Sequence, residues 1–269
     1  NERFPNHNEE DITAMLAFAE ENGFGPITAQ FTIDYTFGDD FTIPEGMNLV
    51  IGAYQNDDNY HAATVTIPAG KTLTVNGNVQ VAKKSALVIE EGAKLIFNGT
   101  TFNSYGSLIN NGTILMDKGY ADIMGTYEHG ENAQVILEAY DEDTAELYGI
   151  DQQLITLIYR GNDELRLQNF LLVMSYNRYA QGNAYIEGPM TMTRNWYAEP
   201  YNWDPDMEFD VDIYVTGEGT VLTVPETSTG LSINTSIYVQ DGGCVNVTGA
   251  LYSMIVGSRI ALPTPCGVS

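Results

Sequence analysis

The chain has 269 residues, 43% of them hydrophobic, so it is long and apolar enough to bury a core. Its 36 acidic side chains outnumber 11 basic ones, which gives a formal net charge of -25. A field of that sign repels phosphate backbones and anionic lipid, which argues against nucleic acid as a partner. No apolar run approaches the roughly 20 residues that span a bilayer, so we expect no membrane insertion.

The first predicted element is a helix over residues 8–22. Asn8 is of the type that caps a helix, and Ile12 and Ala19 belong to an apolar stripe at helical spacing. Gly23 supplies a residue that ends a helix readily. We expect this helix to cover one open end of a stack of strands, because uncovered strand edges favour aggregation.

Glycines recur through the next part of the chain, each three residues before a leucine that opens a short apolar segment. Gly46, Gly70, Gly92 and Gly112 follow this pattern at steps of 24, 22 and 20 residues, and the pattern resumes at Gly219. Such a period fits one coil of a β-solenoid, because a single coil must stack on its neighbours to bury its apolar side. The predicted fold is therefore all-β, a right-handed parallel β-helix or solenoid with coils of about 20–24 residues; a β-sandwich is the alternative.

Residues 125–214 lose the glycine repeat and are rich in tyrosine. Within them, residues 154–174 are predicted to form strands around a turn at Gly161. We interpret 1–269 as one solenoid domain in which 125–214 is an elaborated or inserted region of open boundary.

Four phrases carry a family resemblance: "FTIPEGMNLVI", "VTIPAGKTLTV", "SALVIEEGAKLIFNGT" and "GSLINNGTILMDKG", all within residues 41–119. They resemble the repeats of adhesin-like right-handed β-helix proteins on bacterial surfaces, especially in gut bacteria. The resemblance implies a secreted or cell-surface protein with a structural, adhesive or glycan-contacting role, whose partner is a glycan or a host or cell-surface protein. A start at Asn1 without an apolar leader fits a processed exported protein.

An acidic row follows in "WDPDMEFDVDIYV". In an extended strand, acids at every second position lie on one face. That row is a solvated strand face, a calcium site or, as a third alternative, a catalytic site. Calcium needs six to eight oxygen ligands, so neighbouring coils would have to contribute. The row consists of Asp204, Asp206, Glu208, Asp210 and Asp212.

Both tryptophans and two tyrosines gather just before this row, in a stretch that is too polar and too interrupted by proline for a core strand. Flat aromatic faces beside polar side chains suit sugar rings, although the same rings could instead pack a loop onto the solenoid. The candidate glycan-binding residues are Trp196, Tyr197, Tyr201 and Trp203.

Catalytic signatures are sparse. The motif set of polygalacturonase-like hydrolases is missing except for "GDD" at 38–40, and Arg194 alone could serve as the base that a calcium-dependent pectate lyase requires. The three histidines have no zinc-ligand spacing, and Cys244 and Cys266 could be free or bridged. We therefore expect a non-enzymatic protein without a cofactor, with a calcium-dependent polysaccharide lyase or glycoside hydrolase as the alternative.

Overall fold

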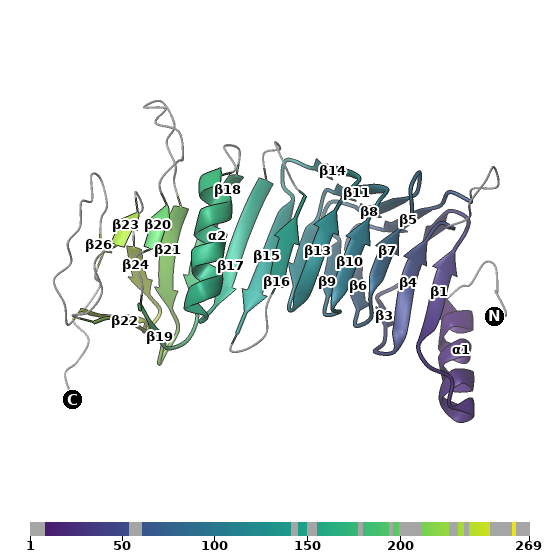
Figure 1. Cartoon of the computed structure of the whole chain (residues 1–269), viewed down its shortest axis with the longest axis horizontal. Coiled ribbons are helices and arrows are strands. Elements are labelled where there is room, and N and C mark those ends of the chain that lie inside the picture. The colour runs from purple at the N-terminus through teal and green to yellow at the C-terminus, as the bar shows by residue number, and fades with distance from the viewer. Residues whose placement is uncertain are drawn as a thin grey trace. The chain divides into compact units, whose positions relative to one another are not determined.

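The computed structural model describes residues 9–53, 61–140, 145–149, 155–176, 180–193, 196–198, 211–225, 231–233, 237–247 and 260–261. Its strands pair in parallel and return to the same sheets coil after coil, so the chain is a parallel β-solenoid (Figure 1). This confirms the predicted fold class and excludes the β-sandwich, whose sheets are antiparallel. The chain divides into two compact units, Asn1–Val135 with Ala145–Asp151 (unit 1) and Ile136–Thr144 with Gln152–Ser269 (unit 2).

In unit 1 the chain passes through three parallel sheets in turn. The first holds β1 (Ile27–Phe31), β4 (Met47–Ile51), β7 (Val79–Val81), β10 (Thr101–Ser104), β13 (Gly119–Ile123) and β16 (Ala145–Tyr148). The second holds β2 (Tyr35–Thr36), β5 (Thr64–Ile67), β8 (Ala86–Ile89), β11 (Ser107–Asn110) and β14 (Thr126–His129). The third holds β3 (Phe41–Ile43), β6 (Thr72–Val75), β9 (Lys94–Phe97) and β12 (Thr113–Met116).

Alternation along these short strands builds the core. In the third sheet Leu73 and Ile114 both lie in register with Leu95, and all three side chains are buried. Side chains at equivalent inward positions therefore stack from one coil to the next, so that each apolar side chain packs against those of the neighbouring coils. Lys94 pairs with Thr72 on one side and with Thr113 on the other, which gives coils of 22 and 19 residues.

The repeated glycines lie at the corners between sheets. Gly70 and Gly92 have φ of 74° and 76°, a region that favours glycine. At Gly112 a Cβ atom would lie 2.3 Å from the Ala93 carbonyl oxygen, so close approach of two coils requires glycine there. Gly46 opens β4 in the first sheet, whereas Gly70 opens β6 in the third. The 24-residue step from Gly46 to Gly70 is therefore not one coil, and that part of the predicted period was wrong.

Helix α1 (Glu9–Asn22) confirms the predicted N-terminal helix over the described part of residues 8–22. Gly23 has φ of 67°, and the Phe24 amide donates to the Ala19 carbonyl at 3.0 Å, which is the hydrogen bond of a Schellman helix end. Ile12 and Ala19 are buried, and α1 lies against β1, the last strand of its sheet. The helix thus has the position expected of a cap.

Unit 2, taken by itself, is also a parallel β-solenoid. Its longest sheet has the order β15 (Gln134–Ala139, in this unit from residue 136), β17 (Ile155–Gly161), β18 (Ala180–Ile186), β21 (Val211–Thr216), β24 (Ile237–Gln240) and β26 (Ile260–Ala261). A second sheet holds β19 (Met190–Thr191), β22 (Val221–Val224) and β25 (Cys244–Val247), and a third pairs β20 (Trp196–Ala198) with β23 (Leu231–Ile233).

Helix α2 (Glu164–Tyr176) lies in the segment predicted as strands, so that prediction was wrong after Gly161. Asp163 caps the helix, because its Oδ1 accepts the Arg166 amide at 2.8 Å. The buried side chains of α2 recur at helical rather than strand spacing, and α2 lies against β18 and β20. These buried side chains are Leu167, Phe170, Leu171 and Met174.

Candidate functional site

The outer face of the longest unit 2 sheet carries a row of four side chains in register. Arg160 of β17 pairs with Tyr185 of β18, and Tyr185 with Tyr214 of β21, which pairs in turn with Tyr238 of β24. All four are half-buried, while their neighbours along each strand, such as Ile213, point into the core. Strand alternation therefore fixes these side chains on the outside of the solenoid.

Three of these residues, Tyr185, Tyr214 and Tyr238, form what we call the tyrosine row. The ring centroids are 4.9 Å and 5.0 Å apart, with interplanar angles of 15° and 18°. The separation follows from the strand spacing, so each ring stacks on the next and carries its hydroxyl away from the sheet. Burial, and less strongly the charge of Asp212, raises the pKa of the Tyr214 hydroxyl, which keeps its proton and can both donate and accept.

Polar side chains flank the tyrosine row on both sides. Asn183 and Asp212 lie in register two residues before it, and the Tyr214 hydroxyl is 3.5 Å from Asp212 Oδ2. Thr216 and Gln240 lie in register two residues after it, and the Thr216 hydroxyl donates to Asp241 Oδ2 at 3.3 Å. The face is consequently a grid of hydrogen-bonding groups with an aromatic centre.

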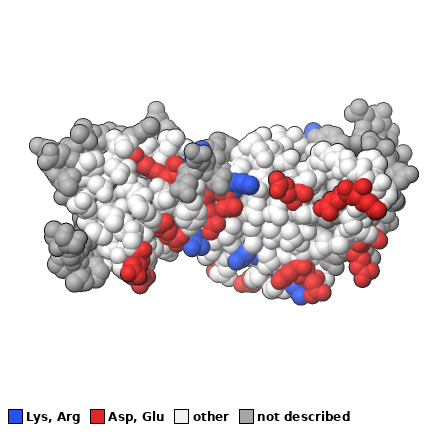
Figure 2. Space-filling model, turned by 90° about the horizontal axis from the view of Figure 1, so that it is seen from below, with Lys and Arg blue, Asp and Glu red and all other residues white. Residues whose placement is uncertain are grey.

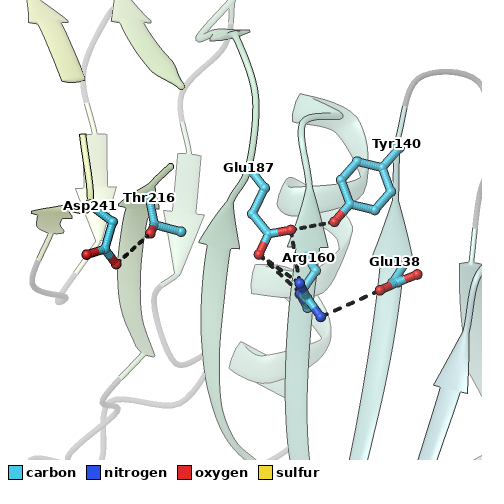
Figure 3. Close-up of polar contacts among 6 residues, drawn as sticks. All are labelled: Glu138, Tyr140, Arg160, Glu187, Thr216 and Asp241. Carbon is cyan, nitrogen blue, oxygen red and sulfur yellow. Dashed lines mark hydrogen bonds and ion pairs between the residues drawn. The ribbon is translucent and has the colours of Figure 1, made fainter. Parts of the chain in front are cut away.

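An ion-pair network borders the row at β17 (Figure 3). The Arg160 guanidinium donates through Nε and Nη2 to Glu187 Oε1 at 3.2 Å and 3.1 Å, and Nη1 lies 3.7 Å from Glu138 Oε1. The Tyr140 hydroxyl donates to Glu187 Oε2 at 2.5 Å. Both oxygens of Glu187 therefore have partners, and Arg160 compensates two carboxylates at once.

Protonation in this network is fixed. Burial raises the pKa of Tyr140, and its hydrogen bond to Glu187 raises it further. For Arg160 the contacts with Glu187 and Glu138 outweigh the opposing effect of burial, so the pKa of the guanidinium is raised. Arg160 is thus held as a cation, which suits it to bind and orient rather than to abstract a proton.

A pocket of about 410 Å³ opens beside the grid, where β18 and β21 end. Glu187 and Thr216 contribute to its wall, so the pocket adjoins the network and the polar flank of the tyrosine row. The pocket is shallow and largely open to solvent, so it is a depression of the surface rather than an enclosed cavity. The remaining lining residues are Gly188, Pro189, Gly217, Glu218, Gly219 and Thr220.

Of the predicted acidic row, Asp212 alone lies among the described residues; Asp204, Asp206, Glu208 and Asp210 lie outside them. Asp212 has the outward orientation that alternation predicts, between buried Val211 and Ile213. Among the described residues no three acidic, histidine or cysteine side chains are grouped as metal ligands. In the face that Figure 2 shows, acidic side chains form separate patches, several of them beside a basic one. Calcium at the acidic row stays a prediction.

The predicted aromatic site is described in part. Trp196 and Tyr197 lie in strand β20, in register with Leu231 and Ser232 of β23, so this stretch does form a short strand. Tyr201, Trp203 and the candidate base Arg194 lie outside the described residues. The glycan-binding role of Trp196, Tyr197, Tyr201 and Trp203 therefore stays a prediction.

Sequence reasoning missed the tyrosine row, although a local signal exists. Tyr185, Tyr214 and Tyr238 each stand between two apolar residues, as in the "IYV" triplets at 213–215 and 237–239. Aligning these triplets would have placed the tyrosines on one outer face, because the flanking apolar residues must point inward.

Two further findings complete the description. Cys244, in β25, is disulfide-bonded. No helix among the described residues has the length and hydrophobicity to cross a membrane.

The fold defines the chain as a parallel β-solenoid with an aromatic and polar outer face in unit 2. Comparison with protein-family models, curated proteins and solved structures gives no match. Any functional assignment therefore depends on the chemistry of this face.

Proposed function

We propose that the chain is an exported, non-enzymatic β-solenoid protein with an adhesive or glycan-contacting role, and that the outer face of unit 2 makes the contact. The tyrosine row carries this proposal, because three hydroxyls at regular spacing lie between two lines of amide, hydroxyl and carboxylate groups. Because the stacked rings cover one another's faces, the row offers ring edges and hydroxyls, and these hydroxyls can exchange hydrogen bonds with the hydroxyls of a sugar.

Export is supported by the covalent chemistry of the chain. Disulfides persist in oxidising compartments and outside the cell, and Cys244 is disulfide-bonded. The repeats over residues 41–119 resemble those of bacterial surface adhesins, which favours the same location. The net charge of -25 excludes neither a glycan nor a protein as the partner.

The protonation states favour binding over catalysis at this face. A lyase base must lose its proton before it can abstract one, whereas Glu187 and Glu138 raise the pKa of Arg160. A glycosidase needs one carboxylic acid and one free carboxylate, whereas both Glu138 and Glu187 pair with the same guanidinium. The network therefore stabilises the sheet beside the binding face.

The proposal is tested by binding and turnover on a panel of plant, mucin and microbial polysaccharides. Each polysaccharide is incubated once with calcium and once with a chelator, and released sugars are measured together with bound protein. We expect binding without product, and loss of binding in Tyr214→Ala. The matched control is Tyr120→Ala, which removes a tyrosine that is 41% exposed in unit 1.

Two results would contradict the proposal. Release of product would show that the protein is an enzyme. Product that forms only with calcium would favour calcium binding and catalysis at the acidic row, which consists of Asp204, Asp206, Glu208, Asp210 and Asp212. Binding of no polysaccharide would remove the glycan-contacting role.

A further inference from the structure

The tyrosine row has a regular spacing that a ligand must match. Successive rings are 4.9 Å and 5.0 Å apart, and the hydroxyls follow one another in the direction in which the coils of unit 2 stack. This distance is close to the length that one sugar residue adds to an extended β-linked polysaccharide. A chain laid across β18, β21 and β24 would therefore place one sugar residue over every strand.

The charges around the row select against anions. Glu187 and Asp212 lie beside the row, Asp241 contacts Thr216, and Glu218 lines the pocket. Arg160, which lies in register with Tyr185, is already bound by two carboxylates. An added carboxylate or sulfate would meet an excess of negative charge, since these four carboxylates outnumber the single guanidinium beside them, whereas sugar hydroxyls can donate to carboxylate oxygens.

The two flanking lines set the width of the site. Side chains two positions apart on one face of a strand are roughly 7 Å apart, so Asn183 and Asp212 lie at one edge of a bound chain and Thr216 and Gln240 at the other. Hydroxyls on both edges of a sugar ring then find partners. The pocket next to Glu187 and Thr216 offers room for a branch or a chain end.

Building on the proposed function, we infer that the ligand is an uncharged, extended, β-linked polysaccharide that runs along the tyrosine row with one sugar residue per strand. The row spans the three strands that carry Tyr185, Tyr214 and Tyr238, so three sugar residues fill it, and the network at Arg160 borders a fourth position. Longer chains gain no further contact with this face.

The test is calorimetric titration with β-1,4-linked glucose and mannose oligomers of one to six residues, and with uronic acid oligomers of the same lengths. We expect affinity to rise about fivefold for each residue up to three or four, since one added hydrogen bond contributes roughly 1 kcal/mol, and then to level off. Uronic acid oligomers bind at least about tenfold more weakly, because each carboxylate meets like charge.

Variants locate the binding site. Tyr238→Ala removes the end of the row, so affinity levels off one residue earlier, while Tyr120→Ala in unit 1 changes nothing. Tyr214→Phe keeps the ring stack and removes a hydroxyl, so it weakens binding and leaves the urea midpoint of unfolding unchanged. This variant separates loss of a contact from loss of the fold.

The outcomes distinguish the inference from the proposed function. If neither oligomers nor polysaccharides bind, both fail. Three other results would overturn this inference and leave the glycan-contacting role standing. Affinity could fail to depend on oligomer length, or uronic acid oligomers could bind as tightly as uncharged ones. Alternatively, binding could be lost in Trp196→Ala and kept in Tyr214→Phe.

Discussion

Tyr127 and its neighbours form a polar cluster inside the last coils of unit 1. Asn110 Nδ2 donates to the Tyr127 hydroxyl oxygen at 3.3 Å, and that hydroxyl lies 2.7 Å from His129 Nδ1. Burial lowers the pKa of His129, which favours the neutral ring, and its Nδ1 can then accept a hydrogen bond from the Tyr127 hydroxyl. The cluster shows how a solenoid core accommodates polar groups when each of them has a partner.

Alkaline unfolding tests this cluster. Burial raises the pKa of Tyr127 to about 12 from 10.0, so the stabilisation is complete below pH 10 and is lost as pH rises toward 12. Two pKa units correspond to a full loss of about 3 kcal/mol, and Tyr127→Phe, which has no hydroxyl to ionise, should lack this pH-dependent loss. Urea unfolding between pH 8 and 11.5 should show the free-energy gap between wild type and variant narrowing at high pH, with Tyr120→Phe as the control. A free-energy difference between wild type and variant that stays constant with pH would contradict the raised pKa of Tyr127.

Arg160 is the second residue whose role can be isolated. Arg160→Gln removes the cation that Glu138 and Glu187 share. Two half-buried carboxylates are then left near each other without that positive charge. Because Arg160 is 39% exposed, we expect a loss of only about 1 kcal/mol in the free energy of unfolding, measured by urea titration. In Lys71→Gln, which breaks a pair with the exposed Asp39, the loss should be smaller. Equal losses in both variants would contradict a special role for Arg160.

At the scale of elements, the corners decide how closely the coils stack. Gly112 lies where the Ala93 and Glu90 carbonyl oxygens would be 2.3 Å and 2.5 Å from an added Cβ atom. Gly112→Ala must push two coils apart, and overpacking of this kind costs about 1–3 kcal/mol. Gly38→Ala is the matched control, because nothing lies within 4 Å of the added Cβ. In urea, Gly112→Ala should unfold at a lower midpoint than Gly38→Ala. Similar midpoints would contradict the close approach of the two coils at Gly112.

The same corners explain which elements the sequence could predict. Glycines at Gly70, Gly92 and Gly112 recur because each coil needs a positive φ or a small residue at that corner, so the repeat predicted a solenoid. Helix α2 was missed, although Asp163 provides a cap and the buried residues of "LRLQNFLLVM" have helical spacing.

At the scale of the whole molecule, the site depends on register rather than on sequence distance. Arg160, Tyr185, Tyr214 and Tyr238 are separated by 25, 29 and 24 residues, and they form one row because strand pairing brings them together. The intervening segments differ in length from coil to coil, so no fixed period connects these residues. Sequence reasoning instead favoured residues that are close in the chain, such as Trp196 and Tyr197.

The central claim is that the outer face of unit 2 contacts a glycan through the tyrosine row. The most direct measurement is ¹⁹F NMR of protein containing fluorotyrosine, with the 17 tyrosine resonances assigned by single Tyr→Phe variants. On addition of a polysaccharide that binds, we predict that the resonances of Tyr185, Tyr214 and Tyr238 shift together while those of Tyr120 and Tyr127 do not. Shifts confined to Tyr197 and Tyr201 would contradict the claim and transfer the binding site to the aromatic stretch before the acidic row.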